Sequence, residues 1–265
     1  MAMTAYFTAL RLRTQSGKQG LELMTTDAFL ERLAHAIRDN ATLPVFPSGV
    51  TVDDAYRLLP KLTERVSSHP HVGLKAGLTN ADLQQLFSLE EPLLGLLYDS
   101  CEIRPGNVMP FSPHRLIECE MCVTYQDDGR PIAVGPAVEF VSVRFAKPED
   151  MTPGNLTLCN LGADKFMKGE MTAWEDFDFD ALGNLEIVAT RDGETLLKTT
   201  PLESLGGPVT AHEWCIEKAK SLGFTLPQNG ILLAGTNGSA LPAEPGNYDV
   251  HYGHLGTISF SISAT

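Results

Sequence analysis

Hydrophobic residues recur every three to four positions in the first part of the chain, which is the spacing of one face of an α-helix. In DAFLERLAHAIRDN, the residues Phe29, Leu33 and Ile37 follow this spacing, and Thr26 before them is a suitable N-cap. The pattern therefore predicts a first helix that begins after Thr26.

A second helix is predicted after Thr51, because Thr51 and Asp54 fit the pattern of a capping box at the start of an amphipathic stretch. Pro60 should kink or shorten this helix, since proline lacks the backbone N–H that the helix interior uses. A short third helix is predicted after Asn80 in ADLQQLF. The early part of the chain is thus mainly helical.

The hydrophobic period changes to two from about Leu116, which is typical of strands. LIECEMCVTY and AVEFVSVRF flank the turn QDDGR, and NLEIVAT and ETLLKT flank the hairpin signal Asp192-Gly193. One late helix is expected, with Thr210 and Glu213 as a capping box and Gly223 at its end. The remaining predicted strands are GILLAG, YDVHY and TISFSIS.

This order of elements predicts an α+β protein, with a small helical region in residues 1–70 and a large, mostly β domain in residues 71–265. The length of 265 residues is sufficient for a sizeable core. We find no internal repeat and no low-complexity segment.

The charge balance narrows the class of partner. Thirty-three acidic residues against 20 basic residues give a formal charge of −13, which argues against nucleic acid and anionic membranes as partners. The first twenty residues lack the pattern of a secretory signal, and no apolar run is long enough to span a membrane. Five scattered cysteines indicate reduced thiols. We expect a cytoplasmic protein.

Glu118 and Glu120 are two positions apart in a predicted strand, so their side chains project from the same face. The opposite face carries Cys119, Met121 and Val123, which suit a core. Taken alone, this stretch favours the solvated side of an amphipathic strand.

Glu139 lies inside the apolar run AVGPAVEFVSV, where burying a lone carboxylate is costly. Two interpretations remain open from the spacing. Glu139 joins Glu118 and Glu120 around a hard cation such as Mg²⁺ or Mn²⁺, or it forms an ordinary ion pair with a base such as Arg144.

Lys75 and Asp99 each have two interpretations. Lys75 stands between Gly73 and Gly77, either as a buried cation facing carboxylates or, more commonly for a single lysine, on the surface between two turns. Asp99 follows an apolar run, where it caps the next turn or serves as an acid or base, and capping is the commoner role.

Several apparent motifs carry little weight. Cys119 and Cys122 match C-x-x-C, but an odd separation directs strand side chains to opposite faces. His251 and His254 lie in a glycine-rich turn without a companion cysteine, which favours surface histidines over a zinc site. There is no P-loop, no dinucleotide fingerprint and no nucleophile elbow.

Taken in order, the segments resemble the 2-oxopent-4-enoate hydratase and 4-oxalocrotonate decarboxylase group of the fumarylacetoacetate hydrolase superfamily. The resemblance extends over nearly the whole chain, and E-x-E followed about twenty residues later by P-A-x-E is its most specific part. The segments are VGLKAGLTN, EPLLGLLYDS, IECE, AVGPAVEFVSVRF, NLGADKFMKGE, a Trp-containing helix and GILLAGTNGSALPAEPGNYDVHYGHLGTISF.

The resemblance implies a mixed β-roll like the C-terminal domain of fumarylacetoacetate hydrolase, with peripheral helices. It also implies Mg²⁺ or Mn²⁺ held by Glu118, Glu120 and Glu139, with Lys75 and Asp99 beside the ion. Members of the group act on small 2-oxo or 2-hydroxydienoic acids from meta-cleavage of aromatic compounds. They are commonly homo-oligomers, and a complex with another pathway enzyme is a further expectation.

The leading hypothesis is a metal-dependent hydro-lyase that hydrates a 2-hydroxy-2,4-dienoate to a 4-hydroxy-2-oxo acid. Alternatives are a 4-oxalocrotonate-type decarboxylase, an acylpyruvate hydrolase with His114 as the candidate base, and a non-catalytic subunit that supports such an enzyme. The chain departs from the group near Asn160, where Gly162 and Ala163 offer no serine hydroxyl, and at Ala76, where a larger aliphatic residue is common. These departures indicate an altered substrate pocket.

Overall fold

A computed structural model describes residues 27–264 and groups them into two compact units. The first unit contains residues 27–68 together with residues 143–162, and the second contains 69–142 and 163–264. The division into a 1–70 region and a 71–265 domain stays a prediction, and the structure adds 143–162 to the helical unit. Thr26 and the N-terminal twenty residues lie outside the described part of the chain.

The first unit is built from helices, whose apolar positions pack against one another. Phe29 of the first helix packs edge-on against Phe46, and Phe46 packs against Phe145. The Asp150 carboxylate accepts a hydrogen bond from the backbone N–H of Phe46. The helical segments are α3 (Asp27–Arg38), α4 (Val52–Val66), η3 (Pro148–Asp150), α6 (Pro153–Leu158) and η4 (Asn160–Gly162).

Helix α4 confirms the predicted capping box. The Thr51 hydroxyl accepts a hydrogen bond from the backbone N–H of Asp54, and the Asp54 carboxylate accepts one from the backbone N–H of Thr51. Pro60 lies inside the helix, which continues to Val66. Pro60 therefore does not shorten this helix, because the buried apolar face, including Leu62, holds the last turn in place, and a kink at Pro60 stays a prediction.

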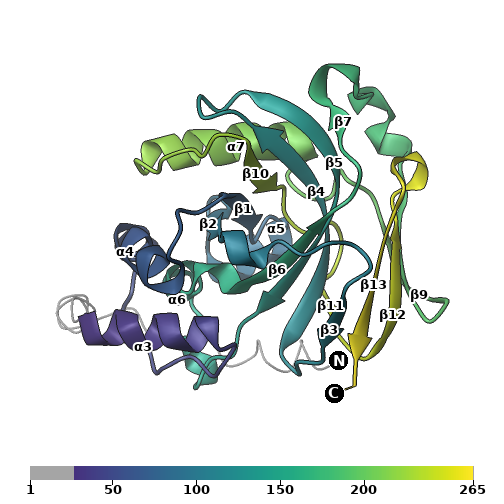
Figure 1. The fold of residues 1–265 in the computed structure, drawn as a ribbon. Helices are drawn as coiled ribbons and strands as arrows, with labels where there is room; N and C mark the ends of the chain where they lie inside the picture. The colour runs from purple at the N-terminus through teal and green to yellow at the C-terminus, as the bar shows by residue number, and fades with distance from the viewer. Residues whose placement is uncertain (1–26, 265) are drawn as a thin grey trace. The chain divides into compact units, whose positions relative to one another are not determined.

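The second unit contains two sheets. The larger has the strand order β2-β1-β10-β4-β5-β6, with β11 paired to β4 and β7 paired to β5. The long strands β4 and β5 curve through the unit (Figure 1). The strands of this sheet are β1 (Gly73–Gly77), β2 (Leu93–Leu97), β4 (Arg115–Tyr125), β5 (Pro131–Ser142), β6 (Ala163–Lys168), β7 (Thr172–Ala173), β10 (Gly230–Leu233) and β11 (Leu241–Pro242).

The smaller sheet has the order β3-β13-β12-β8-β9. It contacts the larger sheet where the Phe140 ring packs edge-on against Phe260 and the Tyr252 hydroxyl donates to the backbone carbonyl of Ala137. Its strands are β3 (Val108–Pro110), β8 (Ile187–Arg191), β9 (Glu194–Thr199), β12 (Gly246–His251) and β13 (Thr257–Ser263).

Two α-helices belong to the second unit. Helix α5 (Ala81–Phe87) begins at the predicted N-cap Asn80, whose side chain accepts from two backbone N–H groups. Helix α7 (Pro208–Ser221) contacts β1, β2 and β4. The predicted start of α7 at Thr210 is wrong: Gly207 is the N-cap, since Pro208 suits the first helical position. Short 3-10 turns are η2 (Asp99–Cys101), η5 (Trp174–Asp176), η6 (Phe179–Asn184) and η7 (Gly253–Leu255).

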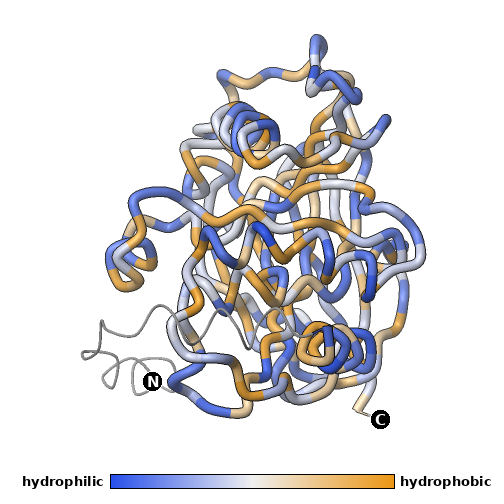
Figure 2. Tube along the Cα trace, turned by 90° about the vertical axis from the view of Figure 1, so that its left-hand side faces the viewer, coloured by the Kyte–Doolittle hydropathy of each residue, from blue (hydrophilic) through white to orange (hydrophobic). Residues whose placement is uncertain are grey.

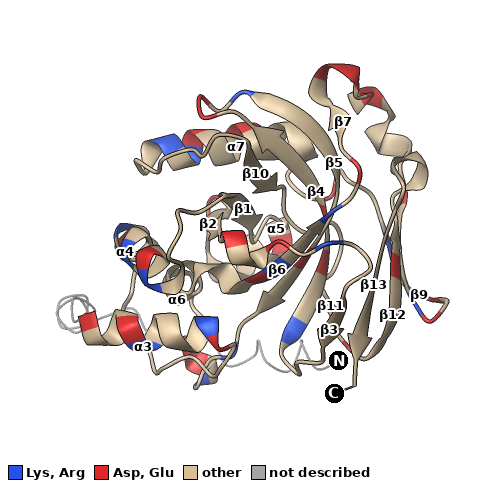
Figure 3. Ribbon diagram, in the orientation of Figure 1, with Lys and Arg blue, Asp and Glu red and all other residues tan. Residues whose placement is uncertain are grey.

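The predicted α+β class and all seven predicted strands are confirmed. Hydrophobic and hydrophilic positions alternate along the helices in the hydropathy-coloured trace (Figure 2). Charged residues lie mainly on helices and in turns (Figure 3), so a buried carboxylate inside a strand is an exception that calls for a reason. Among the described residues, none of the helices combines the length and apolar character needed to cross a membrane.

We predict that Thr51→Ala lowers the free energy of unfolding by about 1 kcal/mol, because the Asp54 N–H loses its acceptor at the start of α4. Urea unfolding at neutral pH measures the change. Thr51→Ser is the matched control, since it keeps the hydroxyl and should retain most of the stability. Equal stability of Thr51→Ala and the wild type would contradict the capping role.

Candidate active site

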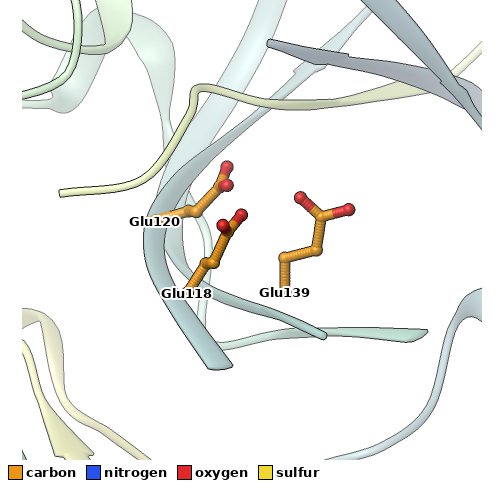
Figure 4. Close-up of side chains that lie close together, drawn as sticks. All are labelled: Glu118, Glu120 and Glu139. Atoms are coloured by element: carbon orange, nitrogen blue, oxygen red, sulfur yellow. The ribbon is translucent and has the colours of Figure 1, made fainter. Parts of the chain in front are cut away.

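Three glutamates converge on one face of the β4–β5 pair. Glu118 of β4 lies directly opposite Glu139 of β5, and Glu120 lies two residues further along β4 on the same face. Each residue offers a carboxylate oxygen within 4.8 Å of the others. Figure 4 shows the three side chains extending to the same side of the strands, with their carboxylates near one another. The antiparallel register therefore brings the three side chains to one face of the strand pair.

Burial of the cluster corrects one expectation. The side chains of Glu120 and Glu139 are 0% and 1% exposed, and Glu118 is partly buried. The interpretation of Glu118 and Glu120 as the solvated side of an amphipathic strand is wrong, because both faces of β4 are covered at this point. Alternating side chains of β4 thus give one face with carboxylates and one apolar face, and neither face is open to solvent at this point.

Lys75 supplies a buried positive charge beside the cluster. It occupies the centre of β1 with only 2% of its surface exposed, and its Nζ lies 2.5 Å from Glu139 Oε1. The prediction of a surface lysine between turns is wrong, because Gly73 and Gly77 are the ends of a buried strand. Gly73 permits close strand packing: a Cβ there would lie 1.9 Å from the backbone oxygen of Ile231 in β10.

The loop after β10 supplies hydrogen-bond donors to two of the carboxylates. The backbone N–H of Gly235 donates to Glu120 Oε2 at 2.8 Å, and the Thr236 hydroxyl donates to Glu118. These contacts were not predicted from the sequence. The only signal was the pair Gly235-Thr236 itself, which entered as part of the family resemblance without a structural role.

The cluster contains more carboxyl groups than positive charges. Burial raises the pKa of Glu139 to about 7 against the opposing effect of the Lys75 ammonium, and the charge of Glu118 adds to the rise. Burial and the charges of Glu139 and Glu118 raise the pKa of Glu120 well above its usual value. Burial also raises the pKa of Glu118. Two buried carboxyl groups and one partly buried carboxyl group thus face a single lysine within the described part of the chain.

The same carboxylate charges stabilise the charged form of Lys75. Burial alone lowers the pKa of the Lys75 ammonium, but the charges of Glu139, Glu118 and Glu120 outweigh burial and raise the pKa above its ordinary value. The ammonium is therefore held in its charged form by the carboxylates it faces. The ion-pair interpretation of Glu139 holds, with Lys75 rather than Arg144 as the base, whereas the cation interpretation stays a prediction.

Two carboxylate oxygens provide a test of whether the cluster suits a cation. Glu120 Oε1 and Glu139 Oε2 are buried and have no hydrogen-bond partner among residues 27–264. Unsatisfied buried carboxylate oxygens are costly, and carboxylate oxygens are the preferred ligands of hard divalent cations. The donor set of Glu118, Glu120 and Glu139 therefore fits a divalent metal ion.

Asp99 lies in a different setting from the glutamates. It begins η2, its side chain is 37% exposed, and its Oδ2 lies 3.0 Å from His69 Nδ1. The pair of Asp99 with His69 lies beyond the end of the β1–β2 ladder, where Gly73 faces Leu97. Lys75 lies further inside the ladder, where it faces Gly95. Asp99 also accepts from the backbone N–H of Ser100, which is a local capping contact. A chemical role for Asp99 stays a prediction.

The other candidates from the sequence do not join the cluster. His114 is exposed in the turn before β4. Cys119 and Cys122 are buried free thiols three residues apart in β4, on opposite faces as predicted. His251 and His254 are exposed, and His251 Nδ1 lies 2.8 Å from the Thr257 hydroxyl.

Near Asn160, where the chain departs from the family pattern, the backbone is unusual. Asn160 and Leu161 both adopt left-handed φ angles, of 55° and 53°, and both side chains are buried. Non-glycine residues rarely adopt this conformation, and two in succession are rarer still. The segment therefore turns sharply at the position where the family serine is missing.

We predict that Glu120→Gln stabilises the metal-free protein at neutral pH, because it removes one buried charge and leaves Lys75 paired with Glu139. The folded-state pKa of Glu120 is raised, so its ionisation costs stability above the pKa of the unfolded chain. The gain should shrink as the pH falls toward that value.

Denaturant unfolding in the presence of EDTA at pH 7.5 and pH 4.5 measures this effect. Glu170→Gln is the control, since Glu170 is exposed and its substitution should leave stability unchanged. A Glu120→Gln variant less stable than the wild type at pH 7.5 would show that the cluster is not strained by its own charge.

Comparisons with known proteins bear on the fold and the family. No protein-family model matches the chain. It is 25% identical to the 2-keto-4-pentenoate hydratase of Paraburkholderia xenovorans over 236 residues, which cover 80% of this chain and 84% of that protein. It is 30% identical to REH2-associated factor 2 of Trypanosoma brucei brucei over 129 residues, so the match spans about half of each chain, 48% in both cases.

Solved structures share the fold. The structure of 4-oxalocrotonate decarboxylase from Pseudomonas putida, complexed with magnesium and adipate, superposes with a TM-score of 0.77, 24% identity and coverage of 95% of this chain and 100% of that chain. Fumarylacetoacetate hydrolase from Exiguobacterium antarcticum superposes with a TM-score of 0.54 and 14% identity over 76% of this chain and 77% of that one. The fold is that of the fumarylacetoacetate hydrolase superfamily, and the resemblance to its 2-oxopent-4-enoate hydratase and 4-oxalocrotonate decarboxylase group is confirmed.

Proposed function

We propose that this protein is a divalent-metal-dependent hydro-lyase that adds water to a small 2-hydroxy-2,4-dienoate and yields a 4-hydroxy-2-oxo acid. The observation that carries the proposal is the convergence of Glu118, Glu120 and Glu139, with carboxylate oxygens within 4.8 Å of one another. The similarity to two proteins named 2-keto-4-pentenoate hydratase supports the choice of reaction.

Glu118, Glu120 and Glu139 would hold the ion, Mg²⁺ or Mn²⁺. Solved structures of the same fold are described as complexed with magnesium, calcium or Mn²⁺, which supports a divalent ion in general. When bound, such an ion supplies positive charge that polarises the 2-oxo group and stabilises negative charge on its oxygen. The two unpartnered oxygens, Glu120 Oε1 and Glu139 Oε2, would be available to such an ion.

Lys75 provides the second positive charge of the site. Its ammonium is charged and buried against Glu139, so it can bind the carboxylate or enolate oxygen of a substrate that reaches the cluster. Lys75 is buried, and a low-dielectric environment strengthens such an interaction. We assign Lys75 to the binding and stabilisation of the anionic substrate.

Asp99 is our candidate for proton movement. The dienol loses its 2-hydroxyl proton while its terminal carbon gains one, which gives a conjugated 2-oxo-3-enoate. Water then adds with its oxygen on C4 and a proton on C3. Asp99 is open to solvent and paired with His69, so it can exchange protons with bulk water.

A 4-oxalocrotonate-type decarboxylase is the second candidate, because the superposition on such an enzyme covers 95% of this chain. An acylpyruvate hydrolase needs a base that activates water. Both His69 and His114 are exposed, and His69 is the better candidate because its ring is paired with the Asp99 carboxylate. The same three glutamates would serve either reaction, so the products distinguish them.

A non-catalytic role is the alternative from another class. It is favoured by one observation, the 30% identity over 129 residues to a protein named as an associated factor. Assembly as a homo-oligomer, association with another pathway enzyme and a place in aromatic catabolism stay predictions.

We predict that the purified protein binds Mg²⁺ or Mn²⁺ in the presence of oxalate, an analogue of the enolate of pyruvate, when followed by calorimetry. Glu118→Gln and Glu139→Gln should each weaken binding by at least about 10-fold, because each removes an anionic ligand. Glu170→Gln should bind like the wild type. Absence of metal uptake by the wild type would favour the non-catalytic alternative.

We predict that the Mn²⁺-loaded protein converts 2-hydroxypenta-2,4-dienoate to 4-hydroxy-2-oxopentanoate, followed by loss of dienol absorbance and by mass spectrometry of the product. Lys75→Met should abolish turnover while leaving a folded protein that is detected by circular dichroism. Release of carbon dioxide from 4-oxalocrotonate, without hydration of the dienoate, would replace the hydratase assignment by the decarboxylase.

A further inference from the structure

The loop between β10 and β11 runs beside the part of β4 that carries the glutamates. Strand β10 ends where Leu233 faces Cys122, and β11 begins where Leu241 faces Ile117. Residues 234–240 therefore lie along residues 118–121 of β4, with seven residues against four. An excess of residues forces the loop away from a regular ladder, so its conformation must be fixed by other contacts.

Gly235 is the point at which this loop contacts the cluster. Its φ angle of +93° lies in the region that favours glycine, and its N–H donates to Glu120 Oε2 rather than to a backbone carbonyl of β4. A Cβ at this position would lie 2.4 Å from Thr79 Cγ2 and 2.5 Å from Ser204 Oγ. The donor is thus enclosed by side chains from two other segments.

Ser204 and Asn237 fasten the loop on both sides of Gly235. The Ser204 hydroxyl donates to the backbone carbonyl of Ala234 at 2.7 Å, and the backbone N–H of Ser204 donates to Asn237 Oδ1 at 3.3 Å. The backbone N–H and the side-chain amide of Asn237 both donate to the carbonyl of Cys119, at 2.8 and 3.2 Å. Both side chains are 1% exposed.

These hydrogen bonds form a chain that starts at the backbone of β4 and ends at the carboxylate of Glu120, which is itself a residue of β4. Cys119 lies between Glu118 and Glu120 in β4, and its carbonyl anchors Asn237. Asn237 contacts Ser204, and Ser204 holds the carbonyl of Ala234, the residue immediately before Gly235. The position of the Gly235 N–H is therefore set relative to β4 itself.

We propose that Ser204 and Asn237 are positioning residues, which hold the Gly235 N–H on Glu120 Oε2 and thereby keep Glu120 Oε1 directed toward Glu118 and Glu139. This inference rests on the proposed function, since it concerns how the glutamates bind a divalent ion. The occupied oxygen fixes the rotation of the carboxylate, and the unpartnered oxygen is left for the ion. Partners that orient metal ligands in this way commonly change affinity by about 10- to 100-fold when removed.

The experiment measures Mn²⁺ affinity by calorimetry in the presence of oxalate for the wild type, Ser204→Ala and Asn237→Ala. We expect each variant to bind about 10- to 100-fold more weakly. The fold loss of Mn²⁺ affinity in the double variant should be smaller than the product of the two single losses, because both residues act through the same N–H. The electron paramagnetic resonance spectrum of bound Mn²⁺ should broaden in each variant as the Glu120 carboxylate loses its fixed orientation.

Thr63→Val is the matched control, since the Thr63 hydroxyl is also buried and donates to a backbone carbonyl, that of Leu59 in α4. It should lower the melting temperature of the metal-free protein without changing Mn²⁺ affinity. Each variant is first shown to unfold cooperatively without metal, and the separate Ser204 and Asn237 variants keep the test valid if one of them fails to fold.

The outcomes separate this inference from the proposed function. Wild-type affinity in both Ser204→Ala and Asn237→Ala, with a lowered melting temperature like that of Thr63→Val, would overturn the positioning role and leave the proposed function intact. Absence of Mn²⁺ binding by the wild type would overturn the proposed function, and the positioning role with it.

Discussion

Repulsion among buried carboxylates is the constraint on which the rest of this structure depends. Glu118, Glu120 and Glu139 are forced together by the pairing of β4 with β5, and Lys75 provides one opposing charge. In a low-dielectric interior, such an arrangement persists only if the surrounding sheet is rigid enough to hold it. The apolar residues on the opposite face of β4 and β5, including Phe140 packed against Phe260, supply that rigidity.

The position of Lys75 follows from the same requirement. A lysine in a sheet interior needs a neighbouring anion, and Glu139 needs a neighbouring cation, so each residue lowers the cost of burying the other. The strand that carries Lys75 reaches the cluster through β10, which packs so closely on β1 that Gly73 has no room for a side chain. Close backbone packing and buried charge are therefore linked in this part of the sheet.

Much of the fold was predictable from local patterns. The alternation in LIECEMCVTY, the turn QDDGR and the capping box at Thr51 each specify their element through neighbouring residues, and each was confirmed. Strands β1, β2 and β6 were not predicted, because they are short or buried on both faces and lack a two-residue period. The burial of Glu120 was also missed, since nothing in its own strand indicates what covers it.

The candidate site also has a part that the sequence predicted and a part that it did not. The convergence of Glu118 with Glu139 follows from strand alternation once the pairing is known, and the pattern of two strands around the turn QDDGR indicated that pairing. Ser204 and Asn237 are 33 residues apart in sequence, and their contact depends on the tertiary course of two loops. The pair of His69 with Asp99 likewise joins the segment before β1 to the segment after β2. No periodicity in the sequence reports such contacts.

The hairpin between β4 and β5 has one consequence for how this protein can vary. The five residues 126–130 set which residue of β5 faces Glu118. Because strand side chains alternate, an insertion or deletion that slips the ladder by one residue would rotate Glu139 into the hydrophobic interior and bring Phe140 to the carboxylates. A slip by two would preserve the parity of the strand. A change in the length of this turn is therefore compatible with the carboxylate cluster only if Glu139 still faces Glu118.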